Sequence, residues 1–137
     1  YSLLFVGWWL DLDMITVIAA IIKKDDKILI GRRAPYENAP GMWELPGGKL
    51  KNGESKKDCL KRELEEELGI DANIGDLYTN YVYEYPQTSY DLWFYNVYDY
   101  AGEFQYNAHD KLEWITPEKY NDYNFLPGDI PLLDKLK

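Results

Sequence analysis

The sequence is short of cysteine and histidine, with one of each among its 137 residues. The single cysteine, Cys59, excludes an internal disulfide and suits a reducing compartment, so we expect a cytoplasmic protein. Because Cys59 falls inside a predicted helix, we interpret it as a small packing residue rather than a catalytic thiol. No histidine or cysteine pair has the spacing of a zinc site, and nothing in the sequence therefore suggests zinc.

Basic residues are also scarce, with 15 Lys and Arg against 24 Asp and Glu, so the formal net charge is −9. This charge argues against binding to a nucleic acid polymer or to an acidic membrane surface. A small polyanionic substrate is still compatible with it, provided that a divalent metal supplies positive charge locally. Long apolar runs are missing as well, because the run from Leu3 to Leu10 is too short for a bilayer, which needs about 20 residues.

Residues 1–13 differ in character from the rest of the chain, and Met14 directly precedes a strongly predicted strand. We expect Met14 to be the native start of a single domain over residues 14–137, with residues 1–13 as an upstream extension. The alternative is a native segment that covers an edge strand or a partner's surface. Because its aromatic side chains need burial, we expect the extension to pack on a neighbouring chain or on the domain's own groove. The protein would then be a monomer or a homodimer.

Two β-hairpins are predicted from β-branched and aromatic runs. The first pairs residues 15–22 with 27–32, and the second pairs residues 77–85 with 92–100. The remaining chain is expected to form an irregular polar loop over 102–111 with His109 at its surface, a short strand over 113–115, and helices that begin at Thr116 and Asp129.

A helix is predicted from Ser55 to Leu68, after a turn at Gly47 and Gly48. Gly69 follows where a left-handed C-cap is expected. Leucines recur every fourth residue on one face of this helix and mark the side that turns to the core: Leu60, Leu64 and Leu68.

Carboxylates crowd the neighbouring face of the same helix. Glu63, Glu66 and Glu67 fall together there, whereas Glu65 points to solvent. Like charges three or four residues apart destabilise a helix by roughly 0.2–0.5 kcal/mol each, so the cluster favours a bound cation. Carboxylate oxygens are the ligands that Mg²⁺ or Mn²⁺ prefers. The alternative is a solvated acidic face.

The spacing of fixed residues in this region resembles the signature of the Nudix hydrolases. Five residues separate Gly48 from Glu54, and seven more lead to the run Arg62-Glu63-Leu64-x-Glu66-Glu67-x-Gly69-Ile70. Three further segments resemble the MutT-like branch, which includes 8-oxo-dGTP diphosphatases and CTP pyrophosphohydrolases: residues 32–34, 43–49 and 126–133.

This resemblance implies an α/β (α+β) fold, with a mixed β-sheet sandwiched between helices. It also implies a Mg²⁺-dependent enzyme that hydrolyses a nucleoside triphosphate to the monophosphate and pyrophosphate, with Mn²⁺ as a possible substitute. Glu63, Glu66 and Glu67 would be metal ligands, joined by a carbonyl at Gly48, and Glu63 is the candidate base for the attacking water. Glu54 would support the metal shell.

Other implied roles concern the substrate. Arg62 would orient a glutamate of the signature, Gly47 would keep the backbone tight, and Lys49 would meet a phosphate. Arg33 is either a solvated strand end or a contact to phosphate or carboxylate. Asp129 matches a position that contacts the base, and it is also placed to cap the last helix.

One position departs from the family pattern. Many relatives carry a glutamate in the loop before the late tryptophan, here Trp114. This sequence has Ala108 at that place, followed by His109 and Asp110. Either Asp110 substitutes for the missing acid, or the acids of the signature suffice.

Two alternatives remain open. A hydrolase of ADP-ribose, nucleotide sugars or dinucleoside polyphosphates would share the signature, and Pro86 lies where relatives of that type carry a proline, although a hairpin turn also explains it. A non-catalytic module that binds nucleotides is the second alternative. The presence of Glu63, Glu66 and Glu67 together argues against such a module.

Overall fold

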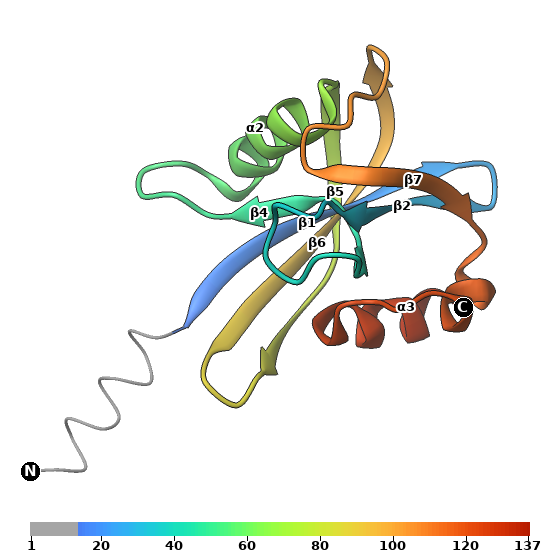
Figure 1. Ribbon diagram of the computed structural model, residues 1–137. Coiled ribbons are helices and arrows are strands. Elements are labelled where there is room, and N and C mark those ends of the chain that lie inside the picture. Colours follow the sequence, from blue (N-terminus) through green and yellow to red (C-terminus); the bar gives the residue numbers. More distant parts are fainter. Residues whose placement is uncertain (1–13) are drawn as a thin grey trace, which may run out of the picture.

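The computed structural model describes residues 14–137 (Figure 1). The prediction made for residues 1–13 lies outside this range. The elements follow in the order β1 (Ile15–Lys24), β2 (Lys27–Arg33), β3 (Trp43–Glu44), β4 (Gly47–Lys49), α2 (Lys56–Leu68), β5 (Asp71–Glu84), β6 (Ser89–Ala101), β7 (His109–Ile115), the 3₁₀ helices η1 (Pro117–Asp122) and η2 (Pro127–Asp129), and α3 (Ile130–Leu136).

Strand β1 is the centre of a mixed sheet. It pairs in parallel with β6 and antiparallel with β4 and β2, and the order β3-β2-β1-β6-β5 gives the main path of the sheet. Strand β7 pairs with β2, antiparallel. The predicted hairpins are both present, and their strands run longer than expected, above all β5 and β6.

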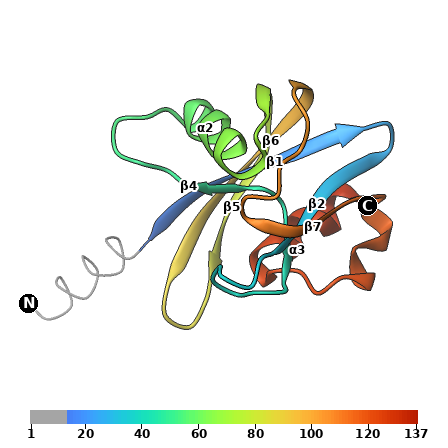
Figure 2. The ribbon, with the colours of Figure 1, turned by 45° about the horizontal axis from the view of Figure 1, so that its top comes forward.

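The sheet is covered on both faces, by α2 on one and by α3 on the other (Figures 1 and 2). Alternate residues of β1 serve the two cores: Ile18, Ala20 and Ile22 pack with the α2 leucines, while Ala19 and Ile21 pack on the α3 side. A strand that is buried on both faces reads as a continuous apolar run, which explains the sequence of β1. The predicted α/β (α+β) sandwich is therefore confirmed.

Helix α2 begins and ends as its sequence indicates. The Ser55 hydroxyl accepts a hydrogen bond from the Asp58 N–H at 3.1 Å, and Gly69 adopts the left-handed conformation with φ 67°. Leu60, Leu64 and Leu68 are fully buried. The core leucines therefore fix how the acidic face of α2 is turned.

Two local predictions were wrong. Gly47 and Gly48 lie in strand β4 against β1 rather than in a turn. Strand β7 already begins at His109, within the expected loop, because residues 109–115 find a pairing edge on β2. The helix starts predicted at Thr116 and Asp129 are confirmed, since these residues are the N-caps of the 3₁₀ helix η1 and of α3. Among residues 14–137, no helix is long and apolar enough to cross a membrane.

Candidate active site

A cleft of about 1070 Å³ crosses the molecule beside β4 and α2. Its lining includes Gly48, Glu63 and Glu67 as well as Tyr85 and Asp129. Residues far apart in sequence therefore meet along one surface, which carries carboxylates together with aromatic and apolar side chains.

Two glycines place the backbone of β4 against its neighbours. A Cβ atom added at Gly47 would lie 2.1 Å from the Ile18 carbonyl oxygen, and one added at Gly48 would lie 2.3 Å from Cδ of Glu63. Real Cβ atoms do not approach so closely, so any side chain here would displace β1 or the Glu63 carboxylate. The glycine pair thus lets the strand pass directly beside the acidic face of α2.

Arg62 holds three of the predicted site carboxylates. Its guanidinium donates to both oxygens of Glu54, at 3.1 Å from Nε and 2.8 Å from Nη2. Nη1 donates to Glu63 at 2.9 Å and to Glu66 at 3.1 Å. The planar guanidinium is a rigid fork of donors, so it sets the direction of these carboxylates and also compensates their charge. The hydrogen bonds from Arg62 lower the pKa of Glu54 to about 2.

Glu67 lies deeper, where its Oε1 atom accepts a hydrogen bond from the Gly47 N–H at 3.2 Å. Burial, followed by the charges of Glu44 and Glu63, raises the pKa of Glu67 to about 9. Burial also raises the pKa of Glu63, against the opposing effect of Arg62. Carboxylates that repel each other in a partly dry site favour either a proton or a cation between them.

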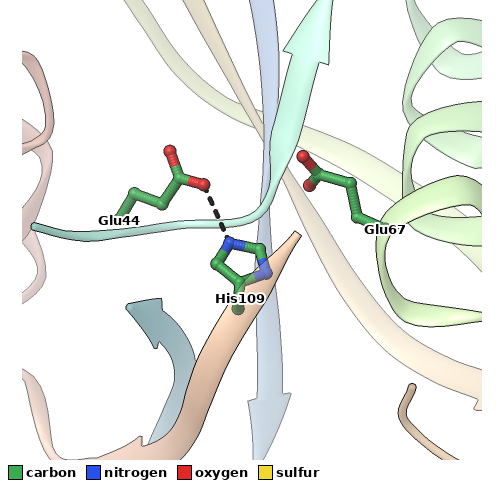
Figure 3. Close-up of side chains that lie close together, drawn as sticks. All are labelled: Glu44, Glu67 and His109. Atoms are coloured by element: carbon green, nitrogen blue, oxygen red, sulfur yellow. Dashed lines mark hydrogen bonds and ion pairs between the residues drawn. The ribbon is translucent and has the colours of Figure 1, made fainter. Parts of the chain in front are cut away.

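A buried pair, Glu44 and His109, adjoins Glu67 (Figure 3). The His109 Nε2 atom lies 2.8 Å from Oε2 of Glu44, and one ligand atom from each of Glu44, Glu67 and His109 falls within 4.8 Å of the others. His109 is 1% exposed and packs flat on Gly31, so its placement at the surface of a loop was wrong. Glu44 has no role among the predicted site residues, although a lone acid between Trp43 and Leu45 is a signal for a buried charge.

Asp110 does not lie at this cluster. Its carboxylate takes both hydrogen bonds of a bidentate pair with Arg32, at 2.7 and 2.9 Å. Arg33, whose role was left open, donates to Glu44 at 2.8 Å and to the Asn38 carbonyl, and it lines the cleft. Arg33 therefore contacts a carboxylate of the protein itself.

Asp129 is buried and lines the same cleft. Its Oδ2 atom accepts a hydrogen bond from the Leu45 N–H at 3.0 Å, and it makes no side-chain hydrogen bond to the start of α3. The expectation that Asp129 caps the last helix was therefore wrong as regards its side chain. Burial raises the pKa of Asp129 to about 7, with Glu44 adding to the effect.

The donor set around Glu63 and Glu67 suits a hard divalent cation. Glu63 and Glu67 line the cleft beside the Gly48 backbone, and Glu66 reaches the same group of side chains through Arg62. All of these donors are oxygen atoms, as Mg²⁺ and Mn²⁺ prefer, and the repulsion among the carboxylates is what a cation would relieve. Lys49 lines the cleft next to them, where it can meet a phosphate.

A mixed sheet between helices, with an acidic helix face beside a Gly-Gly strand, forms a site that suits a divalent cation. Comparison with known proteins gives the family: the NUDIX domain matches residues 13–136, and the chain belongs to the Nudix family.

Individual relatives agree with this assignment. The chain is 40% identical over 121 residues to the CTP pyrophosphohydrolase of Escherichia coli K12, covering 88% of this chain and 90% of that protein. It is 32% identical over 120 residues to the 8-oxo-dGTP diphosphatase of the same strain, covering 88% and 93%. The solution structure of the E. coli ORF135 protein is 40% identical with a TM-score of 0.79, covering 89% of this chain and 87% of the other.

Proposed function

We propose that this chain is a nucleoside triphosphate pyrophosphohydrolase that uses Mg²⁺, or Mn²⁺ in its place, and releases a nucleoside monophosphate and pyrophosphate. The observation that carries the proposal is the single cleft that joins the carboxylates of α2 to Asp129. In this proposal the triphosphate lies beside Glu63 and Glu67, which requires a cation between them, and the uncharged base lies beside the apolar and aromatic lining. The relatives named for CTP and 8-oxo-dGTP make these nucleotides, with dCTP, the first substrates to examine.

In this proposal Glu63, Glu66, Glu67 and the Gly48 carbonyl hold the cation, and Glu54 supports them through Arg62. When bound, the cation would neutralise the charge that grows on the phosphate oxygens and ease deprotonation of water. Glu63 accepts the proton of the attacking water, because burial raises its pKa and makes it a better base than an exposed glutamate. Arg62 keeps that carboxylate in direction, and Lys49 holds a phosphate.

The test is a panel of nucleotides assayed with Mg²⁺: CTP, dCTP, dGTP, 8-oxo-dGTP, ADP-ribose and diadenosine polyphosphates. Monophosphate and pyrophosphate in equal amounts are the expected products, and a reaction in ¹⁸O-labelled water shows which phosphorus is attacked. Hydrolysis of ADP-ribose or a dinucleoside polyphosphate alone would overturn the choice of substrate. Absence of any turnover would make the chain a nucleotide-binding module instead.

Two variants of α2 make the assay specific. Glu67→Gln removes a proposed ligand and should lower kcat by orders of magnitude, whereas Glu65→Gln changes an exposed residue two positions away on the same helix. Equal activity in the two variants would contradict the assignment of Glu67.

A further inference from the structure

The Tyr81 hydroxyl occupies the place where a helix-capping side chain would be expected. It donates a hydrogen bond to the Gly128 carbonyl at 2.6 Å and accepts one from the Leu132 N–H at 3.2 Å. Leu132 is the third residue of α3, and the first N–H groups of a helix have no partner within the helix. Tyr81 therefore supplies an acceptor that the start of α3 needs.

Asp129 is the residue that would ordinarily supply it. An aspartate just before a helix accepts a hydrogen bond from the second or third N–H group of that helix. Here the third N–H group, that of Leu132, donates to the Tyr81 hydroxyl. The Asp129 carboxylate instead accepts a hydrogen bond from the Leu45 N–H and lines the cleft. The two arrangements of Asp129 exclude each other. Capping by its side chain needs an extended backbone, whereas the backbone of Asp129 is helical (φ −86°, ψ −15°) and its carboxylate points to Leu45 and the cleft.

We propose that Tyr81 is a positioning residue for base selection: by capping α3 in place of Asp129, it keeps the Asp129 carboxylate in the cleft. This inference rests on the proposed function for its consequence in catalysis. Tyr81 does not line the cleft, so it acts through Asp129 and not by touching the nucleotide.

Packing around Tyr81 supports a fixed hydroxyl. Its ring stacks on Phe94, with 5.5 Å between ring centroids and 27° between ring planes, on the α3 side of the sheet. Burial, followed by the charge of Asp129, raises the pKa of Tyr81, so the hydroxyl keeps its proton and donates it to Gly128. A second tyrosine, Tyr85, accepts a hydrogen bond from the Gly128 N–H at 2.9 Å. Tyr81 of β5 and Tyr85, which directly follows that strand, thus hold the residue that precedes Asp129.

The first experiment titrates the Asp129 carboxyl by carbon-detected NMR in the unaltered protein and in Tyr81→Phe. In the unaltered protein it should titrate near pH 7, because a buried carboxylate that caps no helix is disfavoured. In Tyr81→Phe the Leu132 N–H loses its acceptor, so the Asp129 side chain should turn to it. The pKa of Asp129 should then fall to the ordinary aspartate value or below. An Asp129 that already titrates at or below that value in the unaltered protein would overturn the proposal without any variant.

The second experiment compares the ratio of kcat/KM for dCTP and dTTP, two pyrimidine nucleotides that differ at the position of the exocyclic amine. Tyr81→Phe should change this ratio by about tenfold toward unity while kcat for the better substrate stays within about threefold. The matched control is Tyr78→Phe, since Tyr78 lies on the same strand and its hydroxyl binds the Lys135 carbonyl at the far end of α3. Tyr78→Phe should leave the ratio unchanged.

The outcomes separate the two proposals. An unchanged ratio with an unchanged Asp129 titration in Tyr81→Phe overturns the role of Tyr81 and leaves the hydrolase in place. Absence of turnover with any nucleotide overturns the hydrolase, and the titration still decides whether Tyr81 directs Asp129. An equal effect of both tyrosine variants would assign the hydroxyls to general stability and overturn the positioning role.

Discussion

The ring of His109 is hydrogen bonded to the carboxylate of Glu44 inside the protein, with 2.8 Å between Nε2 and Oε2. Nδ1 of His109 is buried and finds no hydrogen-bond partner among residues 14–137. A second proton on this ring would therefore create a buried N–H group without an acceptor, which is costly. The hydrogen bond to Glu44 therefore uses Nε2 alone. Together with Arg33, the ring holds the Glu44 side chain next to Glu67.

Replacing His109 should destabilise the protein. In His109→Phe a ring still packs against Gly31, but Oε2 of Glu44 loses its donor, and a buried acceptor left alone costs about 1–3 kcal/mol. Asp110→Asn is the matched control, because it breaks the neighbouring and more exposed pair with Arg32, and exposed ion pairs contribute little to stability. Urea denaturation measures both. A smaller loss in His109→Phe than in Asp110→Asn would contradict this account of Glu44.

Glu67→Gln should gain stability as it loses activity. The pKa of Glu67 is raised to about 9, so its ionised form is disfavoured in the folded protein. The stability that this group contributes is complete below its ordinary pKa and is lost progressively as pH rises toward 9. Without metal at pH 8, the free energy of unfolding of Glu67→Gln should therefore exceed that of the unaltered protein by at least about 1 kcal/mol.

The same variant shows whether a cation binds at Glu67. Adding Mg²⁺ should raise the melting temperature of the unaltered protein, since a ligand that binds only the folded state stabilises it. The increase should be small or missing in Glu67→Gln and preserved in Glu65→Gln. Differential scanning calorimetry at pH 8 with and without Mg²⁺ makes the comparison, and equal increases in all three proteins would remove Glu67 from the ligands.

Local patterns were enough to predict helix α2, whereas the sandwich was predicted from the resemblance to the Nudix family. The leucine spacing, Ser55 and Gly69 lie within one short segment, and their effect depends on neighbours in sequence alone. The same holds for the hairpin of β1 and β2, whose turn residues separate two apolar runs. The acidic face of α2 followed from the same periodicity.

The positions of other site residues depend on contacts between segments that are distant in sequence, which local patterns do not predict. His109 looked like a polar loop residue, and it became buried because β7 found an open edge on β2. Glu44 had no visible partner, since Arg33 and His109 lie 11 and 65 residues away in sequence. Asp129 has a good capping position by sequence. The structure shows why its side chain does not cap: the backbone of Asp129 is helical, and the Tyr81 hydroxyl of a distant strand accepts the Leu132 N–H.

Arg62→Lys should weaken the metal site more than the fold. The guanidinium reaches Glu54, Glu63 and Glu66 together, which a lysine ammonium with its single point of charge cannot do. Positioning contacts of this kind typically change metal affinity or activity by about 10–100-fold. We expect the Mg²⁺ concentration for half-maximal rate to rise by about tenfold, with a change in melting temperature of a few degrees. An unchanged Mg²⁺ requirement would show that the carboxylates hold their positions without Arg62.

Asp129→Asn should remove a pH dependence centred near neutrality. Asp129 has its pKa raised to about 7, so the unaltered protein loses stability as pH rises from the ordinary aspartate value, ~3.9, through about 7. Asparagine keeps an oxygen for the Leu45 N–H and carries no charge, so the variant should lose less stability over this range.

The same titration should appear in binding. Below pH 7 the protonated carboxyl of Asp129 offers a donor, and above pH 7 the carboxylate offers only acceptors, which suit the exocyclic amine of cytosine. The KM for dCTP should therefore fall between pH 6 and 8 in the unaltered protein and stay level in Asp129→Asn. Because kcat depends in this proposal on the carboxylates of α2 and not on Asp129, it should follow the same pH profile in both proteins. A KM that varies equally with pH in both would assign the titration to another group and leave Asp129 without a part in reading the base.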